Sequence, residues 1–274
     1  MTKYRIYVSA TFVLLFFLLI PAFGQGQNHS GQLRKIENNS FHRGEFMVFR
    51  AYYNSRLTGN VTAGEATLEV RPTNMIIGGR STMHVVSEAR TRGLFNLFFR
   101  VTNRYESYLD EQAIAPLMFI RRINEGGYIK NQDVMFNHYD NIATSNTATV
   151  PIAPYVQDII SAFYFARTYD YSDAQVGDAF NVDFFLDDTV YVTRIVFDGR
   201  EQIKTRVGTV NTLRFKPMVL EGTVFNQPYP MTLWITDDKN KIPVMIESGL
   251  VVGRVRLELT EYKGLRNPFS SLVH

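Results

Sequence analysis

The sequence predicts an all-β, mainly antiparallel protein: an elongated curved sheet or open half barrel with one main helix and a short apolar plug segment. From Phe46 onward, short runs of β-branched and aromatic residues alternate with turn residues such as glycine and asparagine. The chain holds 15 Tyr and 21 Phe, a composition that favours strands over helices. In the first run, large side chains such as Phe49 and Arg50 occupy both faces, which suits a curved sheet covered on both sides.

The first 24 residues have the three-part pattern of a secretory signal peptide. Lys3 and Arg5 give a positive start, an apolar run follows, and the small residues Ala22 and Gly24 precede Gln25. We therefore expect cleavage between Gly24 and Gln25 and export to the periplasm or the outer envelope. The alternative is an uncleaved membrane anchor, but an apolar run of about 15 residues is shorter than a bilayer span needs.

Beyond the signal peptide, the sequence divides into three parts. Residues 25–45 are polar and indicate a flexible leader, residues 46–264 form a single β domain, and residues 265–274 form a C-terminal tail. No second stretch is long enough to span a membrane as a helix, so we expect no transmembrane segment in the mature chain. Because the chain has no cysteine, burial rather than disulfide bonds must stabilise the fold.

The charge and the missing motifs exclude several function classes. The formal net charge is +3, and loss of Lys3 and Arg5 would leave +1, so we expect no nucleic-acid partner. The sequence has no His-Glu-x-x-His motif and no glycine-rich phosphate loop, so we expect no metal and no cofactor. It also has no Gly-x-Ser-x-Gly motif, and we expect no enzyme activity.

Adjacent carboxylates occur three times and are candidates for acid–base chemistry on sugars. The pairs are Asp110-Glu111, Asp187-Asp188 and Asp237-Asp238. Neighbouring residues in an extended chain point to opposite faces, which does not suit the paired acids of a glycosidase. We interpret all three pairs as solvated turn residues that accept hydrogen bonds from the backbone.

The clearest hairpin signal is Asp198-Gly199, which separates the strand-like runs Thr189–Phe197 and Arg200–Arg206. Asp-Gly between two such runs predicts a tight type I′ turn, because both central residues need positive φ. A second turn is predicted at Gly126-Gly127.

Two segments interrupt the strand pattern. In Asp158–Arg167 four apolar side chains share one helical stripe: Ile159, Ile160, Phe163 and Ala166. Asp158 is a plausible N-cap, and we expect the stripe to lie on the sheet, with Tyr164 and Arg167 near the opposite rim. The other segment, Thr91–Phe99, is apolar after Gly93 and predicts a short helix or a plugging loop.

A short internal repeat relates Leu109–Phe119 to Thr236–Ile246. In each segment an acidic turn precedes a proline that opens a strand, Pro116 in the first and Pro243 in the second. A duplicated half-sheet is one interpretation of this repeat.

Four blocks of the chain carry a family resemblance. They are Phe49–Leu68, Gly93–Arg100 with Tyr105–Tyr108, Asp158–Arg167, and Leu233–Asp237 with Ile242–Val244. In this order they resemble the exported bacterial family called domain of unknown function 3108, over roughly Phe46 to Tyr262, which is nearly the whole mature chain. The resemblance implies an elongated antiparallel sheet curled into an open barrel, similar to envelope lipoproteins, and it implies no activity. Ile159 departs from the family pattern, which has a proline at the helix start.

The stretch from residue 80 to residue 122 is rich in arginine. Seven arginines against four carboxylates leave it with a charge of +3. The candidate ligand-binding residues are Arg90, Arg92, Arg100, Arg104 and Arg121. If several point into the barrel, they could hold an acidic lipid head group or a glycan carboxylate through paired hydrogen bonds. The alternative is a solvated sheet face with ordinary Glu–Arg pairs.

Aromatic residues form a second candidate set. Its members are Phe95, Phe98, Phe99, Phe163, Phe165 and Trp234. They could line an apolar cavity for acyl chains. The alternative, which we favour, is that the helix and the apolar loop fill the barrel as a plug, because a fold without disulfide bonds needs these rings in its core.

Two functions are compatible with these patterns. The first is a non-enzymatic binding or carrier module for a lipid or an acidic glycan in the cell envelope. The second is a scaffold of the outer envelope that binds a protein partner through a sheet edge or a flat aromatic face. A hydrolase is a third reading, for which the sequence offers no motif.

Overall fold

The computed structural model describes residues 32–56, 59–218, 231–250 and 253–273. The expected signal peptide and its cleavage site at Gly24 and Gln25 lie outside these residues. The helices are α1 (Phe95–Phe98) and α2 (Ile159–Ala166). The strands are β1 (Phe46–Ser55), β2 (Gly59–Arg71), β3 (Ile76–Ile77), β4 (Arg80–Thr91), β5 (Thr102–Asp110), β6 (Pro116–Glu125), β7 (Tyr128–Asn137), β8 (Ile142–Ser145), β9 (Thr149–Pro151), β10 (Ala179–Asn181), β11 (Phe184–Leu186), β12 (Thr189–Tyr191), β13 (Arg194–Thr205), β14 (Gly208–Pro217), β15 (Met231–Thr236), β16 (Pro243–Gly249), β17 (Arg254–Lys263) and β18 (Leu272–Val273).

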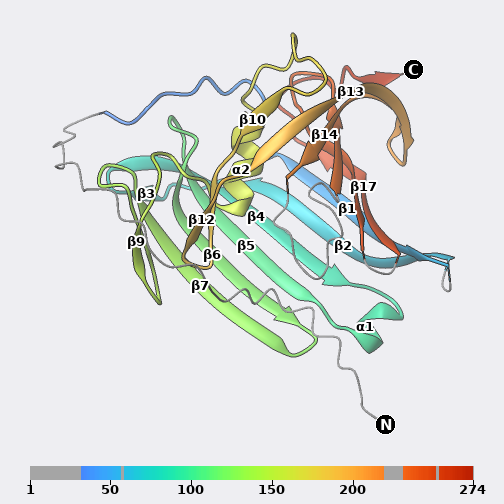
Figure 1. Ribbon diagram of the computed structural model, residues 1–274, viewed down its shortest axis with the longest axis horizontal. Coiled ribbons are helices and arrows are strands. Elements are labelled where there is room, and N and C mark those ends of the chain that lie inside the picture. Colours follow the sequence, from blue (N-terminus) through green and yellow to red (C-terminus); the bar gives the residue numbers. More distant parts are fainter. Residues whose placement is uncertain (1–31, 57–58, 219–230, 251–252, 274) are drawn as a thin grey trace.

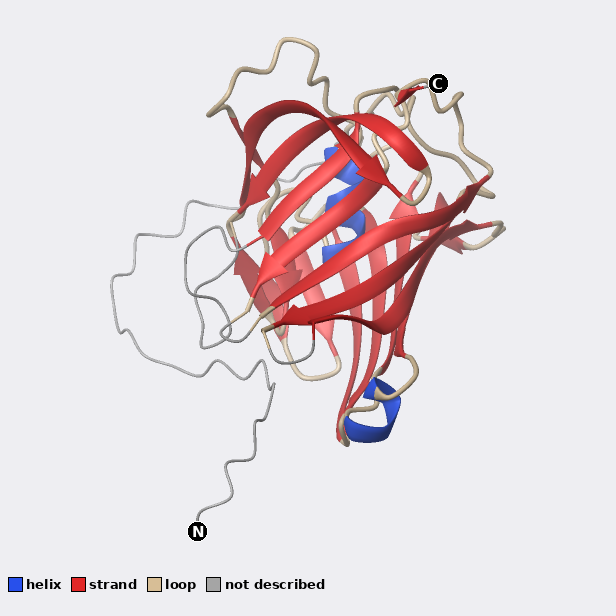
Figure 2. Ribbon diagram, turned by 90° about the vertical axis from the view of Figure 1, so that its right-hand side faces the viewer, coloured by secondary structure: helices blue, strands red, loops and turns tan. Residues whose placement is uncertain are grey.

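One large antiparallel sheet dominates the described chain (Figure 1). Its 16 strands follow the order β10-β13-β14-β15-β16-β17-β1-β2-β4-β5-β6-β7-β8-β9, with β18 beside β14 and β3 beside β4. β11 and β12 form a separate hairpin. The sheet curls around α2 without closing, since the terminal strands β9 and β10 do not pair with each other in the described residues (Figure 2). The predicted fold class, an open antiparallel barrel with one main helix, is confirmed.

α2 begins at Ile159 without a proline because Asp158 caps it. The Oδ1 atom of Asp158 accepts hydrogen bonds from the N–H groups of Ile160 (2.7 Å) and Ser161 (2.8 Å). The Ser161 hydroxyl in turn accepts a bond from the Asp158 N–H at 2.8 Å. This capping box satisfies the free donors of the first turn and fixes where the helix starts. The predicted N-cap is confirmed.

The side of α2 that is most deeply buried differs from the prediction. Tyr164 and Arg167 are 0% and 1% exposed, whereas the predicted stripe around Phe163 is only half-buried. Tyr164 packs edge-on against Phe41, with ring centroids 4.7 Å apart. The prediction considered only the sheet as a packing surface. The segment before β1 covers the second side of the helix and provides a buried carboxylate, Glu45, for Arg167.

The described part of the expected flexible leader, residues 32–45, is packed against the barrel. Leu33 and Phe41 are buried, and the Ile36 N–H donates to the Gln112 carbonyl at 2.8 Å. Polar residues separate these apolar residues in the sequence, so the segment has a polar average composition and its contribution to the core was not predicted. The predicted C-terminal tail is also packed, since β18 pairs with β14 and Leu272 contacts the core.

The prediction of a tight turn at Asp198-Gly199 is wrong. β13 continues through both residues with a bulge between Phe197 and Gly199, and the hairpin turns at residues 206 and 207. Asp198 binds Arg214 (2.6 Å) and Lys216 (2.9 Å) on β14. A bulge also uses a glycine with positive φ, so the local signal fits two structures. The predicted turn at Gly126-Gly127 is confirmed between β6 and β7.

Two of the core clusters fill the space between α2 and the sheet. One joins α2 to β2, β4 and β5 around Val85 and Leu109, and a second joins it to β6, β7 and β11 around Phe119 and Phe185. The strands β13 to β15 share a further cluster around Phe215. Neither helix in the described chain has the length and apolar character needed to cross a bilayer.

Candidate functional site

The arginines predicted to bind a ligand do not converge. Arg90 and Arg104 lie on the outer face of β4 and β5, where strand pairing alternates them with core residues. Arg90 and Arg92 share the carboxylate of Glu65, at 2.9 and 2.8 Å. Arg104 binds Glu106 at 2.7 Å. The outer face therefore carries internal Glu–Arg pairs, as the alternative interpretation states, and these arginines form no binding trough.

Arg121 is the one predicted arginine that points into the barrel, and it is 5% exposed. Its guanidinium and the Lys130 ammonium both bind Asp187 in the turn between β11 and β12. Asp187 and Asp188 both have positive φ, 50° and 59°, as a type I′ hairpin turn requires. Arg121 thus holds the β11–β12 hairpin over the sheet and is paired with a carboxylate of the chain itself.

The aromatic residues of the second candidate set, which we expected to fill the barrel as a plug or to line one cavity, lie in three separate places. Three belong to the β4–β5 connection: Phe95, Phe98 and Phe99. This segment projects from the far end of the sheet, and Phe98 is 85% exposed, so the plug prediction is wrong here (Figure 2). Arg100, which follows it, is also exposed. Phe163 packs inside the barrel on α2, whereas Trp234 lies on β15 and donates its indole N–H to a carboxylate on β13 at 2.6 Å.

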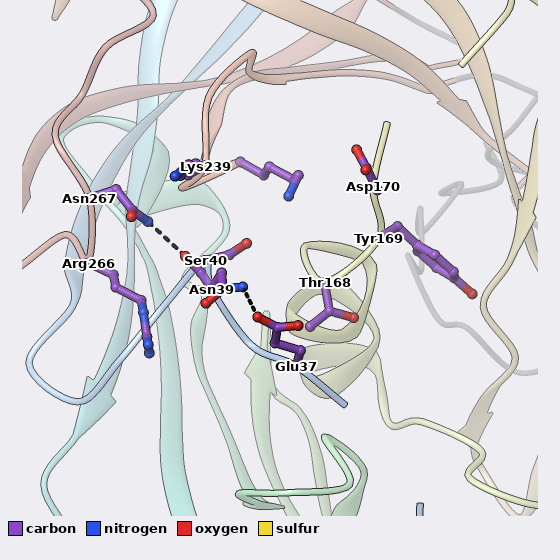
Figure 3. Close-up of a pocket in the computed structure, with 10 residues that line it drawn as sticks. Glu37, Asn39, Ser40, Thr168, Tyr169, Asp170, Lys239, Arg266 and Asn267 are labelled. Atoms are coloured by element: carbon purple, nitrogen blue, oxygen red, sulfur yellow. Dashed lines mark hydrogen bonds between the residues drawn. The ribbon is translucent and has the colours of Figure 1, made fainter. Parts of the chain in front are cut away.

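A polar pocket of about 710 Å³ opens at the opposite end of the barrel, beside the C-terminal end of α2 (Figure 3). Four connecting segments line it: Glu37, Asn39 and Ser40 before β1; Thr168, Tyr169 and Asp170 after α2; Lys239 and Lys241 between β15 and β16; and Arg266 and Asn267 after β17. Loops held by a rigid scaffold are where binding residues concentrate in proteins. We take this pocket as the candidate functional site.

The lining of the pocket suits a polar ligand with negative charge. Its cations are Lys239, Lys241 and Arg266, and its carboxylates are Glu37 and Asp170, which leaves one positive charge in excess (three minus two). The asparagine side chains offer amide oxygens as acceptors, and the tyrosine ring offers a flat apolar face. An acyl chain would strip water from these charged groups without replacing their hydrogen bonds.

Two charged groups of the pocket have shifted pKa values. Burial lowers the pKa of Lys241, although Asp170 nearby favours its charged form. The Ser172 N–H donates to Asp170 at 2.9 Å and lowers the pKa of Asp170, which keeps this carboxylate ionised. Lys241 also has a φ of 50°, which is a strained backbone conformation for lysine. Strained backbone conformations are concentrated at functional sites in proteins. Among the described residues, no group of three or more histidines and carboxylates is arranged to hold a metal ion.

The guanidinium of Arg167 joins three of the four pocket walls. It binds both oxygens of Glu45 at 2.7 Å, and Nε donates to the Asn240 carbonyl at 3.0 Å. Nη2 also donates to the Ser40 carbonyl (3.2 Å), and the Ser40 hydroxyl donates back to the Arg167 carbonyl (2.8 Å). Paired hydrogen bonds between arginine and carboxylate fix orientation as well as distance. Arg167 therefore holds the pocket walls in place from behind.

Asn240 connects the fourth wall. Its side-chain amide donates to the carbonyls of Asn267 (3.0 Å) and Pro268 (3.1 Å), and its Oδ1 accepts from the Asn267 N–H at 2.9 Å. The Asn267 amide then reaches the Asn39 carbonyl at 2.8 Å (Figure 3). Because Asn240 is fully buried, these bonds satisfy groups that would otherwise be costly to desolvate.

Sequence reasoning missed Arg167, Glu45 and Asn240 because their contacts are long-range. Arg167 and Glu45 are 122 positions apart, and Arg167 and Asn240 are 73 apart. An arginine in the last turn of a helix normally reaches solvent and interacts favourably with the helix dipole. One sequence signal could have identified Arg167 as a buried residue: it directly follows the wholly apolar run Phe163–Ala166.

The fold and the pocket define an open antiparallel barrel that encloses a helix and carries a polar pocket in the loops at one end. The chain belongs to the family described as protein of unknown function (DUF3108), whose profile matches residues 48–260. The match runs from β1 into β17 and confirms the resemblance seen in the four sequence blocks.

The fold is similar to solved bacterial structures. A β-barrel-like protein of the domain of unknown function DUF1849 from Brucella abortus has a TM-score of 0.54 and 10% identity, with 85% of this chain and 99% of that chain covered. At this identity the likeness shows the fold alone. A candidate lipoprotein from Parabacteroides distasonis has a TM-score of 0.34 and 13% identity, covering 85% and 100% of the two chains. A candidate exported protein with a YmcC-like fold from Bacteroides fragilis has a TM-score of 0.33 and 12% identity, covering 84% and 100%. No curated protein matches the chain.

Proposed function

We propose that this protein is exported to the cell envelope and binds an acidic glycan in the pocket beside α2, without catalysing a reaction on it. The observation that carries the proposal is the pocket itself, where Lys239, Lys241 and Arg266 lie among asparagine amides and an aromatic ring. Cations recognise the carboxylate of an acidic sugar, amides recognise its hydroxyl groups, and a ring covers its apolar face.

The packing of the barrel favours a glycan over a lipid. Core side chains such as Val85, Leu109 and Phe119 fill the space between α2 and the sheet. The aromatic residues that could have formed an acyl cavity are dispersed, with Phe98 exposed at one end of the sheet and Trp234 paired on β15. An acyl chain needs a continuous apolar surface, whereas the pocket is lined mainly by polar groups.

The chemistry of the pocket favours binding over hydrolysis. Cleavage of a glycosidic bond needs one carboxylic acid that stays protonated near neutral pH. The hydrogen bond from Ser172 lowers the pKa of Asp170 instead, which favours the ionised carboxylate. Asp170 is therefore suited to accept hydrogen bonds from sugar hydroxyl groups.

Export is supported by the pattern of the first 24 residues, in which Ala22 and Gly24 precede Gln25. Protein recovered from the envelope should begin at Gln25 when its N-terminus is sequenced. Recovery of chains that still begin at Met1, in a membrane pellet, would contradict export with cleavage.

Isothermal titration calorimetry with an oligouronide and a neutral oligosaccharide of the same length tests the glycan proposal. The acidic oligosaccharide should bind, and a Lys239→Ala/Arg266→Ala variant should bind it at least about tenfold more weakly, since two charge-assisted contacts are lost. Lys204→Ala, an exposed lysine on β13 outside the pocket, is the matched control and should bind like the wild type. Equal binding of both oligosaccharides, or an unchanged affinity in the double variant, would contradict the proposal.

The scaffold function receives less support from the sheet edges. The terminal strands β9 and β10 contain three residues each, and Pro151 removes a backbone donor from β9. Short edges that carry proline resist pairing with another chain. A protein complex from the envelope that survives the Lys239→Ala/Arg266→Ala change would favour the scaffold function over glycan binding.

A further inference from the structure

The β4–β5 connection presents an apolar surface to solvent. Leu94, Leu97 and Phe98 are 73%, 76% and 85% exposed. Their spacing of i, i+3 and i+4 places them on one side of the single turn of α1. Large apolar side chains gathered in one exposed patch indicate a surface that is covered by a partner. We call the segment Leu94–Phe99 the α1 tip.

The α1 tip is a supported structure. The ring of Phe95 packs edge-on against Tyr53 of β1, with centroids 5.8 Å apart. The ring of Phe99 lies against Gly126, where an added Cβ would come within 2.5 Å of it. The Gly126 N–H donates to the Arg100 carbonyl at 2.8 Å. Two aromatic side chains thus anchor the tip, and the outward apolar side chains are held away from the sheet.

The neighbouring β6–β7 hairpin extends the same apolar surface. It joins the tip through Gly126, and the residues that follow its turn, Tyr128 and Ile129, are 39% and 65% exposed. This end of the sheet therefore presents apolar side chains from two adjacent connections.

Three arginines lie at the same end of the sheet as the apolar side chains. Arg90, Arg92 and Arg100 lie at this end, with Glu65 and Glu125 as the nearby carboxylates. Glu65 binds both Arg90 and Arg92, and among the described residues no carboxylate pairs with Arg100. An apolar patch beside unneutralised arginine is the combination that binds the interface of an anionic bilayer.

We propose that the α1 tip docks this protein on an anionic phospholipid bilayer, with Leu94, Leu97 and Phe98 entering the acyl boundary and Arg100 contacting the phosphates. A second copy of the chain fits less well, because a symmetric contact between two tips would bring their arginines together. A bilayer offers both an apolar layer and a layer of negative charge.

Docking in this way sets the orientation of the barrel. β1 runs from the pocket end to the tip end and has 10 residues, which at the usual rise spans roughly 30 Å. The pocket beside α2 would face away from the bilayer, where a soluble or surface glycan can reach it. The docking proposal does not depend on glycan binding.

Vesicle flotation tests the proposal with the exported form of the protein. Vesicles that contain phosphatidylglycerol should bind it, and pure phosphatidylcholine vesicles should bind it less. A Leu97→Ser/Phe98→Ser variant should bind at least about tenfold more weakly, because two insertable side chains are lost. Both residues are exposed, so its melting temperature should match that of the wild type.

Three further variants sharpen the test. Arg100→Ser should weaken binding to phosphatidylglycerol vesicles and make it less dependent on salt. Ile76→Ser, which is 67% exposed on β3 at the other end, should bind like the wild type, as should Lys239→Ala/Arg266→Ala in the pocket. Failure of the wild type to float with anionic vesicles, or wild-type flotation by Leu97→Ser/Phe98→Ser, would overturn the proposal. A dimer in solution that only the tip variant converts to a monomer would assign the surface to a second copy instead.

Discussion

At the scale of single residues, the pocket depends on one buried ion pair. The side chains of Arg167 and Glu45 are 1% and 0% exposed, so both charges have lost their water. Coulomb attraction offsets such desolvation only when geometry is good and the remaining donors are satisfied. Arg167 meets this condition through two bonds to Glu45 and further bonds to the carbonyls of Ser40 and Asn240.

We expect Arg167→Met to destabilise the protein by about 3–5 kcal/mol, because it leaves the Glu45 carboxylate buried and unpaired. The Arg167→Met/Glu45→Leu double variant should lose less stability than Arg167→Met alone, since no unpaired charge remains. Urea unfolding measures both values. A single variant within about 1 kcal/mol of the wild type would show that the pair does not hold the pocket walls.

Asp158 gives the fold a pH dependence. Burial raises the pKa of Asp158 from 3.8 to about 6, despite the bonds from Ser107, Ile160 and Ser161 that favour its charged form. The folded protein therefore binds a proton that the unfolded chain releases above pH 4. This contribution to stability is fully present below about pH 4 and is lost as the pH rises through about 6, an effect of about 3 kcal/mol.

Asp158→Asn tests this dependence, because asparagine also caps helices and carries no charge. The stability difference between wild type and variant should shift in favour of the variant by about 3 kcal/mol between pH 4 and pH 7, as measured by urea unfolding. Other titrating groups are common to both proteins and cancel in the comparison. A difference that stays constant over this pH range would contradict a raised pKa at Asp158.

Among single residues, the sequence predicted correctly the roles that depend only on residues nearby in the chain. The cap at Asp158 follows from a pattern of adjacent residues, and the structure has it. The outward position of Arg104 follows equally from strand alternation once its partner Glu106, two residues away, is considered. Arg167 and Asn240 could not be identified, because their roles depend on segments that come together only in the folded barrel.

At the scale of elements, turns and bulges share sequence signals. Gly199 has a φ of 123° within the bulge of β13, so a β-branched side chain would be strained there as it would be in a turn. We expect Gly199→Val to destabilise the protein by roughly 1–2 kcal/mol in thermal or urea unfolding. Gly249→Val is the matched control, since Gly249 has neither a positive φ nor an atom within 4 Å of an added Cβ. Equal stability of the two variants would argue against strain at the bulge.

α2 packs as a plug inside the barrel. The ring of Phe163 contacts that of Tyr164 at a centroid distance of 5.3 Å and remains half-buried. We expect Phe163→Ala to cost about 2 kcal/mol, less than the cost at a fully buried site, and to leave the uptake of an apolar dye unchanged. Phe98→Ala, at the exposed tip, should change stability by less than about 0.5 kcal/mol. Wild-type unfolding of Phe163→Ala together with increased dye uptake would indicate a helix that covers a lipid cavity.

The internal repeat corresponds to two related turns at the pocket end. In the first, Asp110 accepts bonds from the N–H groups of Gln112 (2.9 Å) and Ala113 (2.7 Å), and Ile114 has positive φ two positions before Pro116. In the second, Asp238 accepts from Asn240 and Lys241, and Lys241 has positive φ two positions before Pro243. The sequence indicated the shared proline and acidic residue. The repeat as aligned from the sequence matches Asp110 to Asp237, whereas the residue that accepts the backbone hydrogen bonds in the second turn is its neighbour Asp238. The sequence alone did not distinguish these two adjacent aspartates.

At the scale of the whole molecule, turn spacing and aromatic content predicted an open antiparallel barrel, and strand order confirms it. The termini were predicted least well. Residues 32–45 have the polar composition of a leader, yet Leu33 is buried against Ala113 and Ala115, Phe41 packs against α2, and the segment forms a wall of the pocket. Composition averages over such a segment, whereas a few well-placed apolar side chains decide whether it packs.

The two proposed functions lie at opposite ends of the barrel. The pocket end gathers connections that are tied together by Arg167 and Asn240, and it presents charged and amide groups. The tip end presents Leu97, Phe98 and Arg100 on a connection anchored by aromatic contacts. The long strands between them keep the two surfaces apart, so the proposed glycan binding and the proposed bilayer docking can be tested independently.

Native mass spectrometry of the protein isolated gently from its own envelope tests glycan binding most directly. The wild type should have a mass above that of the chain alone, and denaturation should release an acidic carbohydrate that accounts for the difference. The Lys239→Ala/Arg266→Ala variant should lack this bound carbohydrate, and Lys204→Ala should retain it. Wild-type protein that carries no carbohydrate, or a bound carbohydrate that the Lys239→Ala/Arg266→Ala variant retains, would contradict the assignment of the pocket as an acidic-glycan site.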